Sequence, residues 1–315
     1  MADYVPVDDN RFVVSLHARD PPGAFVAFSD FISLFCQRRC NNFRNYAPVD
    51  DNSALSTLES QNIVAVVLHF MNFTGMVIGA FSSPTFWNFS VPLTYSTLSL
   101  DKESRELQSD VHLMACVLLW PFCAAFFLLS AVFQLVPACQ GFYKAGTGTN
   151  SDNLGPNAYR WIEYALSSSI MICVIAALAG IRDVCTLLCI FLLNACMNLF
   201  GLVVEDMNRK YMTGQGYIKP FLFGCIAAIG PWTCIIGTLA ATSGEMPFFV
   251  NFIFWSYLGM FMLFPINMFI EYSSKGDTAA RVSAERGYIV LSVVAKTILG
   301  WAVFFGLKQP PSTCV

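Results

Sequence analysis

Charged residues are scarce in this chain. Only 12% of its 315 residues are charged and 56% are hydrophobic, whereas soluble domains carry roughly 25% charged residues. Phe alone accounts for 29 residues, a frequency typical of helices that face lipid. So few charges exclude a water-facing surface over most of the chain. We therefore predict an all-α membrane protein whose main partner is the lipid bilayer.

Several other features are absent. The net charge of −3 provides no basic face for nucleic acid, so no nucleic-acid partner is expected. The pair Cys36-x3-Cys40 lacks a second pair of ligands, and most other cysteines lie inside apolar runs, so no metal site is predicted. The first 20 residues lack the basic and apolar regions of a cleaved signal peptide, and the first span is expected to act as the signal. No enzymatic activity is predicted.

Seven apolar runs are long enough to cross a membrane, which takes about 20 residues. We predict a bundle of seven transmembrane helices in a domain at 61–307, with an N-terminal extension at 1–60 and a short tail at 308–315. Within the extension, residues 23–35 are apolar but too short to cross, and either form an amphipathic helix at the interface or belong to a partly ordered tail. In the connection 83–110, apolar and polar residues alternate loosely, and this pattern allows a short β-hairpin. The predicted spans are 61–82, 111–137, 157–181, 184–204, 217–241, 246–271 and 284–307.

The distribution of Lys and Arg predicts the orientation. With the N-terminus inside, 13 of the 18 basic residues fall on the inner side and 4 on the outer side, and Lys296 lies within a span. We therefore predict a cytoplasmic N-terminal extension, an extracellular tail, and a hairpin in the first extracellular connection.

Two charges lie where a charge is costly. Lys296 is the only charged residue of 287–306, and a charge at mid-membrane costs between about 3 and more than 10 kcal/mol. Glu163, inside the third span, is its natural partner. Such a pair is expected of a protonated Schiff base and its counterion, because imine formation needs the neutral amine and the iminium needs a nearby negative charge. The alternative is a structural salt bridge between the third and seventh spans.

Other residues extend this candidate site. Aromatic side chains at the expected level of the lysine would form an apolar slot for a flat polyene, although such residues are also common in cores and lipid-facing surfaces. These are Trp232, Trp255, Tyr257 and Trp301. Glu205 ends the fourth span, and we interpret it as an interfacial acid that faces water, as we do Glu271 and Glu285.

The third span contains Arg160-Trp161-Ile162-Glu163-Tyr164, followed by Ser167-Ser168-Ser169-Ile170-Met171. Together with motifs in later spans, this region resembles heliorhodopsins, seven-helix retinal proteins whose N-terminus lies inside. The resemblance runs from about 61 to 307. Its other motifs are Asn194-Ala195-Cys196-Met197-Asn198-Leu199-Phe200-Gly201 with Glu205, Pro231-Trp232, Phe264-Pro265-Ile266-Asn267-Met268, and Ala295-Lys296 with Trp301.

The resemblance implies a rhodopsin-type fold and a role for each of these positions. Lys296 would carry all-trans retinal as a protonated Schiff base, Glu163 would be the counterion, and Ser292 would bind near the Schiff base. The retinal slot would comprise Trp232, Trp255, Tyr257, Trp301, Tyr164, Ser167 and Met171. A polar network beside the counterion would comprise His69, Asn72, Ser130, Gln134 and Arg160.

Within that network, His69 would take a proton from the Schiff base. Heliorhodopsins usually have a histidine where this chain has Gln134, so an acceptor site of two histidines is in doubt. His112, expected at the outer end of the second span, does not replace it. The resemblance also implies a homodimer that uses the outer connection after the first span.

The function that follows is a light-sensing membrane photoreceptor with a slow photocycle, without pumping, acting on an unknown signalling partner. One alternative is a light-gated proton conductor in which Glu205 belongs to the proton path. A second alternative is a receptor or transporter that binds no chromophore, which would lack visible absorbance.

Overall fold

The computed structural model of the chain describes residues 52–100, 106–139, 157–210, 218–242, 247–273 and 278–307. The predicted interfacial helix at 23–35 and the tail at 308–315 lie outside these residues. The elements in chain order are α2 (Asn52–Ser82), α3 (Pro84–Asn88), β1 (Ser90–Leu100), β2 (Leu107–Leu118), α4 (Trp120–Ala138), α5 (Ala158–Ala179), α6 (Val184–Lys210), α7 (Lys219–Ala241), α8 (Phe248–Ser273) and α9 (Thr278–Gly306).

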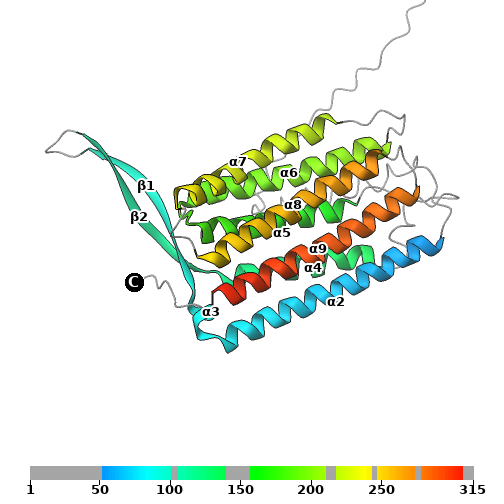
Figure 1. Cartoon of the computed structure of the whole chain (residues 1–315), viewed down its shortest axis with the longest axis horizontal. Coiled ribbons are helices and arrows are strands. Elements are labelled where there is room, and N and C mark those ends of the chain that lie inside the picture. The colour runs from blue at the N-terminus through cyan, green and yellow to red at the C-terminus, as the bar shows by residue number, and fades with distance from the viewer. Residues whose placement is uncertain are drawn as a thin grey trace, which may run out of the picture. The chain divides into compact units, whose positions relative to one another are not determined.

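Seven of the described helices are long and apolar enough to cross a membrane, namely all except α3. The prediction of a seven-helix integral membrane protein is therefore confirmed. Helix α2 begins at Asn52, so the first helix extends into the segment that the sequence assigned to the N-terminal extension. Figure 1 shows the seven helices side by side, with the two strands leaving the bundle at one end. We call this end the hairpin end.

The predicted hairpin is confirmed, and it is longer than expected. Strands β1 and β2 pair antiparallel from Ser90↔Leu118 to Leu100↔Leu107. The predicted second span, 111–137, is therefore wrong at its start, because the helix begins only at Trp120. Residues 111–118 are apolar enough to resemble the start of a span, but pairing with β1 uses their backbone hydrogen bonds. His112 accordingly lies in β2 and not at the end of a span.

Local signals explain where several helices begin and end. The side chain of Asn157 accepts a hydrogen bond from the backbone of Arg160 and caps α5. Gly180 ends α5 with a φ of 108°, which only glycine adopts readily. Asp183 caps α6 by accepting bonds from the backbone and hydroxyl of Thr186, at 2.7 and 2.8 Å. The Thr94 amide binds the Arg182 carbonyl at 2.9 Å, which attaches the hairpin to the α5–α6 connection.

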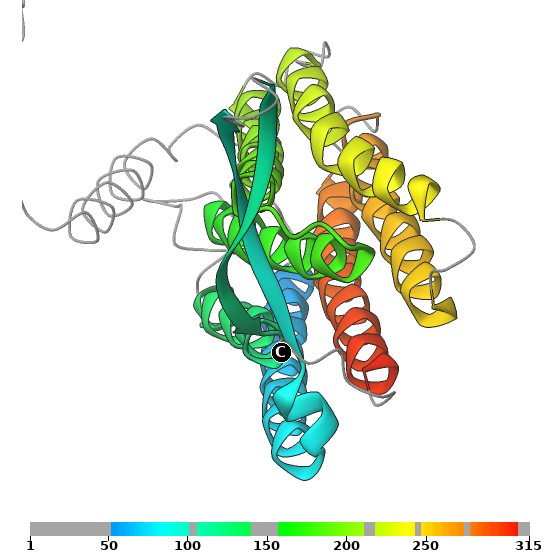
Figure 2. The ribbon, with the colours of Figure 1, turned by 90° about the vertical axis from the view of Figure 1, so that its left-hand side faces the viewer.

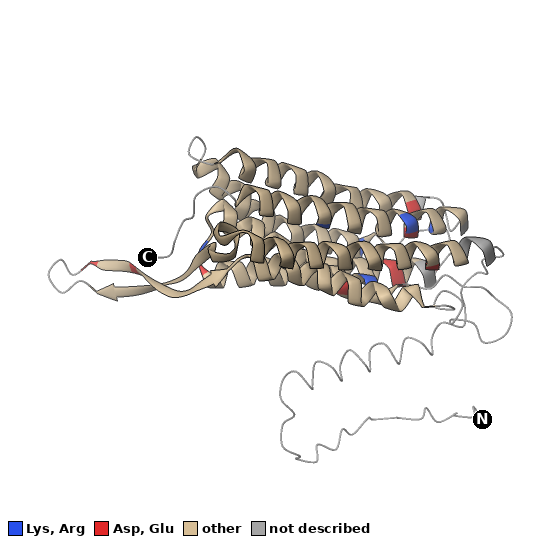
Figure 3. Cartoon of the chain, turned by 90° about the horizontal axis from the view of Figure 1, so that it is seen from below, with Lys and Arg blue, Asp and Glu red and all other residues tan. Residues whose placement is uncertain are grey.

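Helix α5 is the most buried of the seven spans. It packs against α4 and α6, while α2 packs against α4 and α9, and α8 packs against α9. Figure 2 looks along the helices from the hairpin end, with the strands in front of the bundle. Figure 3 shows that most charged residues of the bundle lie toward the end away from the hairpin, which we call the opposite end. The central helix α5 thus brings residues to both the middle of the bundle and its charged opposite end.

Candidate functional site

Lys296 and Glu163 form an ion pair between α9 and α5. The Lys296 Nζ lies 3.0 Å from Glu163 Oε1, and both side chains are about 95% buried. Lys296 also donates to Ser292 Oγ at 2.7 Å, one turn earlier on α9. Ser130 on α4 donates to the same Glu163 oxygen at 2.6 Å. The geometry meets the condition under which a buried ion pair is tolerated, because further hydrogen bonds support both charges.

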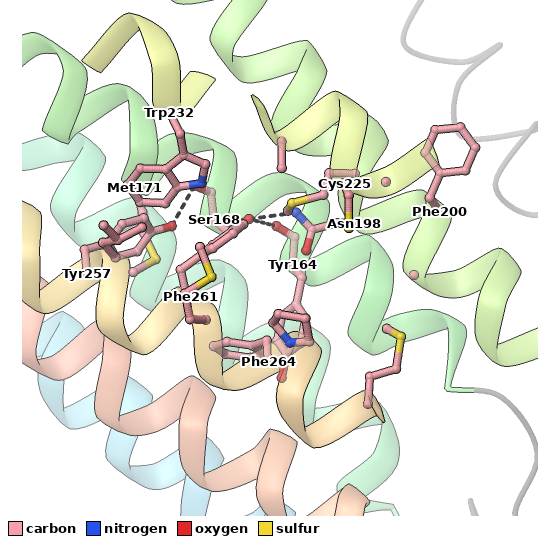
Figure 4. A pocket seen from close by; sticks show the side chains of 18 of the residues that line it. Tyr164, Ser168, Met171, Asn198, Phe200, Cys225, Trp232, Tyr257, Phe261 and Phe264 are labelled. Carbon is pink, nitrogen blue, oxygen red and sulfur yellow. Dashed lines mark hydrogen bonds between the residues drawn. The ribbon is translucent and has the colours of Figure 1, made fainter. Parts of the chain in front are cut away.

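Lys296 lies at the wall of a cavity of about 540 Å³ that is lined by helices α5 to α9. This volume is within the range of small-molecule and cofactor sites. Ile229 and Ile236 line the cavity and are also exposed on the outer surface of α7, so the cavity reaches the lipid-facing side. Figure 4 shows aromatic side chains from several helices converging on it. The sequence-predicted residues that line it are Lys296, Ser292, Tyr164, Met171, Trp232 and Tyr257.

Three predicted members of the retinal slot do not line this cavity. Trp255 is 64% exposed, because it is two residues from Tyr257 and therefore about 200° around the same helix. Ser167 is buried beside the cavity, but its neighbour Ser168 is the residue that lines it. Trp301 instead donates to Asn72 Oδ1 at 2.7 Å.

A polar cluster inside the cavity has no counterpart among the predicted site residues. Asn198 and Asn194 donate to Ser168 Oγ at 3.0 and 2.8 Å, and Ser168 donates to the Tyr164 carbonyl at 2.6 Å. Figure 4 shows Ser168 and Asn198 meeting in the cavity wall. The available signal was the spacing of Asn194 and Asn198, four residues apart in an apolar span and thus on one helix face.

The residues predicted to form one polar network lie in separate parts of the bundle. His69 is fully buried, neither of its ring nitrogens has a hydrogen-bond partner among the described residues, and it interacts electrostatically with Lys296. Asn72 donates to Thr297 Oγ1 at 3.1 Å, joining α2 to α9. Gln134 donates to Asn62 Oδ1 at 3.0 Å. Only Ser130 binds Glu163 directly.

Arg160 lies at the centre of a buried ion cluster at the opposite end. Its guanidinium binds Glu205 at 2.7 Å and Glu285 at 2.5 Å and lies 4.2 Å from the centre of the Tyr288 ring. Glu205 also accepts from the Trp161 indole and, at 3.3 Å, from the Asn157 amide. Arg160 thus joins α5 to α6 and α9.

The interpretation of Glu205, Glu271 and Glu285 as acids that face water is wrong. Their exposed fractions are 0%, 3% and 1%. Glu205 and Glu285 are buried because Arg160, one turn before Glu163 on α5, supplies a cation between them. The sequence placed these acids at helix ends, and only the packing of three helix ends against one another covers them.

The heliorhodopsin family profile matches residues 58–307, which contain the ion pair and every helix of the cavity. The chain belongs to the heliorhodopsin family. The resemblance seen in the sequence is confirmed, and membership implies a retinal chromophore. The cavity fits such a group: it is apolar and lined by aromatic rings, and its one lysine is buried beside a carboxylate.

Solved rhodopsins share the fold of this heliorhodopsin at low identity. A light-driven proton pump from Leptosphaeria maculans matches at 14% identity and a TM-score of 0.56, covering 83% of this chain and 98% of its own. Xanthorhodopsin, a light-driven ion pump with a dual chromophore, matches at 13% identity and a TM-score of 0.57, covering 84% of this chain and 96% of its own. A thermophilic rhodopsin matches at 12% identity and a TM-score of 0.54, covering 83% and 96%. A search of curated proteins finds no match.

Proposed function

We propose that this heliorhodopsin is a light-sensing membrane photoreceptor that carries all-trans retinal on Lys296 as a protonated Schiff base, with Glu163 as the counterion. One observation carries the proposal: the buried Lys296–Glu163 pair, at 3.0 Å, opens onto the apolar cavity of about 540 Å³. A purely structural salt bridge needs no cavity beside it. An attached polyene does need one.

Each residue of the pair then has a task that its contacts support. Retinal, when bound, supplies the absorption of light and the change of shape. Glu163 holds the negative charge, and Ser130 fixes the orientation of its carboxylate. Ser292 orients the lysine nitrogen. Tyr164, Trp232 and Tyr257 exclude water and confine the chromophore. His69 is fully buried and interacts electrostatically with Lys296.

We further propose a slow photocycle without pumping. Pumping requires a separate donor and acceptor on opposite sides of the Schiff base. Among the described residues, no carboxylate lines the large cavity, and Glu163 is the carboxylate that pairs with Lys296. The hairpin end would face outward and the N-terminus the cytoplasm, as the distribution of basic residues favours.

The hairpin supports a homodimer. Leu98, Leu100, Leu107 and Val111 share one face of the strand pair and are 60–74% exposed. The other face carries polar pairs such as Thr97 with His112 and Ser99 with Asp110. Because cross-strand partners share a face, the hairpin is amphipathic, and a second copy of the chain would cover its apolar face.

The visible spectrum of the protein purified with all-trans retinal tests the photoreceptor. Lys296→Ala should abolish the pigment band, while Lys219→Ala, at the exposed start of α7, should retain it. No band in the wild-type protein would overturn the proposal and leave Lys296 and Glu163 as a structural ion pair.

Light-gated proton conduction is a second candidate function. The observation that favours it is the burial of Glu163, Glu205 and Glu285 between the middle and the opposite end of the bundle. Photocurrents under voltage clamp that disappear in Glu205→Gln would support it. A silent membrane under illumination would exclude it.

A further inference from the structure

A second, much smaller cavity is lined by Glu163, which does not line the large cavity. Its volume is about 20 Å³, above the roughly 10–15 Å³ that one water molecule needs. It lies at the junction of α2, α4, α5 and α9. Its polar lining comprises Asn62, Gln134, Asn157, Tyr159, Arg160, Glu163, Tyr164 and Glu285. The cavity therefore has both the size and the polar surroundings of a hydrated site.

One buried donor in this lining lacks a partner. Arg160 is 92% buried and uses its two terminal nitrogens for Glu205 and Glu285. Its Nε has no hydrogen-bond partner among the described residues. Because an unsatisfied buried donor is costly, a water molecule that accepts a hydrogen bond from this Nε would stabilise the structure. Glu163, three residues further along the same helix, faces the same cavity.

The two acids that bind Arg160 differ in their relation to this cavity. Glu285 lines it together with Glu163, whereas Glu205 does not. Glu205 instead accepts bonds from Arg160, from the Trp161 indole and from the Asn157 amide. These three donors all lie at the start of α5, so Glu205 holds the ends of α5 and α6 together.

We infer that a water molecule in the small cavity links Glu163 to Glu285, and that Glu285 is the acid that receives a proton from the counterion. The inference rests on the proposed function, because light must first place a proton on Glu163. The Glu163 carboxyl then gives its proton to the water, and the water gives one to the Glu285 carboxylate. Two O–H bonds break, one on Glu163 and one on the water, and two form, one on the water and one on Glu285. The negative charge moves from Glu285 to Glu163. Arg160 binds the water through Nε and orients it.

The water itself can be tested without retinal. A high-resolution density map of the retinal-free protein should show one ordered water within hydrogen-bond distance of Arg160 Nε and Glu163. A map with no density in the cavity would overturn the inference. This test does not depend on whether the pigment forms.

The proton acceptor can be tested by light-minus-dark infrared difference spectra of the pigment. The wild-type protein should show a new carboxylic-acid C=O band, which Glu285→Gln should remove. Glu205→Gln is the matched control, since it removes the same charge from the other side of the same arginine, and it should retain the band. A band that persists in Glu285→Gln, or that disappears equally in both variants, would overturn the assignment.

Gln134→Leu tests the same path if Glu285→Gln does not fold. It removes a polar wall of the cavity while leaving both acids and Arg160 in place, and it should also abolish the band. An unchanged band would overturn the role of the water. Failure of the wild-type protein to form a pigment would instead refute the proposed function, and would leave the density test of the water unaffected.

Discussion

Ser130 donates a hydrogen bond to the same oxygen of Glu163 that pairs with Lys296. The two contacts, at 2.6 and 3.0 Å, join α4, α5 and α9 at one carboxylate. Glu163 is therefore held from two sides before any chromophore binds. The site is preorganised by three helices that are distant in the sequence.

Removing the Ser130 hydroxyl should weaken the bundle. Hydrogen bonds between membrane helices contribute about 0.6 kcal/mol on average and up to about 1.7 kcal/mol, so Ser130→Ala should cost about 1 kcal/mol in thermal unfolding of the retinal-free protein. Ser60→Ala is a matched control, because the Ser60 hydroxyl binds only a carbonyl of its own helix on an exposed face. Equal stability of both variants would show that the hydrogen bond from Ser130 to Glu163 contributes nothing to the stability of the protein.

The Lys296–Glu163 pair should behave as a coupled unit. Glu163→Gln leaves a buried lysine without its anion and should cost up to about 3–5 kcal/mol of unfolding free energy. Combining Glu163→Gln with Lys296→Met removes both charges, and stability should recover most of that loss. A double-mutant cycle in chemical or thermal unfolding measures the coupling. If the losses in unfolding free energy of the two single variants simply add in the double variant, Lys296 and Glu163 do not interact as a buried pair.

Gly201 should not tolerate a side chain. A Cβ at this position in α6 would overlap the ring of Trp161, and that ring is held by its hydrogen bond to Glu205. Gly201→Ala should destabilise the protein by about 1–3 kcal/mol. Gly237→Ala, in α7 with open space around it, should be neutral or up to about 1 kcal/mol more stable. Thermal unfolding of both variants decides the point.

Acid should release the cap of α6. Hydrogen bonds from the Thr186 backbone and hydroxyl hold the pKa of the Asp183 carboxyl below its usual value. A depressed folded-state pKa means that Asp183 contributes stability above its unfolded pKa of about 3.9. That contribution is lost as the pH falls through the lower folded-state pKa.

Melting temperatures of wild type and Asp183→Ala should therefore differ at neutral pH and converge below about pH 4. Asp183→Asn, whose amide oxygen can accept the same bonds without titrating, should show no such convergence with Asp183→Ala. A constant gap between wild type and Asp183→Ala down to pH 2 would contradict the role of the carboxylate.

The apolar face of the hairpin should control the oligomeric state. Val111→Lys places a charge on the face that carries Leu98 and Leu107 and should convert the proposed dimer to a monomer. Thr97→Lys adds the same charge to the polar face and should leave the dimer intact. Light scattering of the detergent-purified protein gives the mass. A monomeric wild type, or dissociation by Thr97→Lys alone, would refute this interface.

Much of this architecture could be predicted from the sequence, because the bilayer imposes length and hydropathy on each span separately. That constraint placed the seven helices, and it made Lys296 and Glu163 stand out as charges in apolar runs. Motifs in the third to the seventh span indicated the family. The start of the second span was missed, because local apolarity does not distinguish a strand paired with a distant strand from the beginning of a helix.

The tertiary structure alone decided which side chains meet. Helix rotation brings Tyr257 to the cavity and turns Trp255 away from it, and hydropathy carries no information about rotation in a helix that is apolar on every side. The burial of Glu205 and Glu285 likewise depends on three helix ends converging on Arg160. The sequence by itself determined the spans and their unusual charges, since these follow from each segment's own composition. The cavities, the ion cluster and the partners of each acid arise only from contacts between segments far apart in the chain.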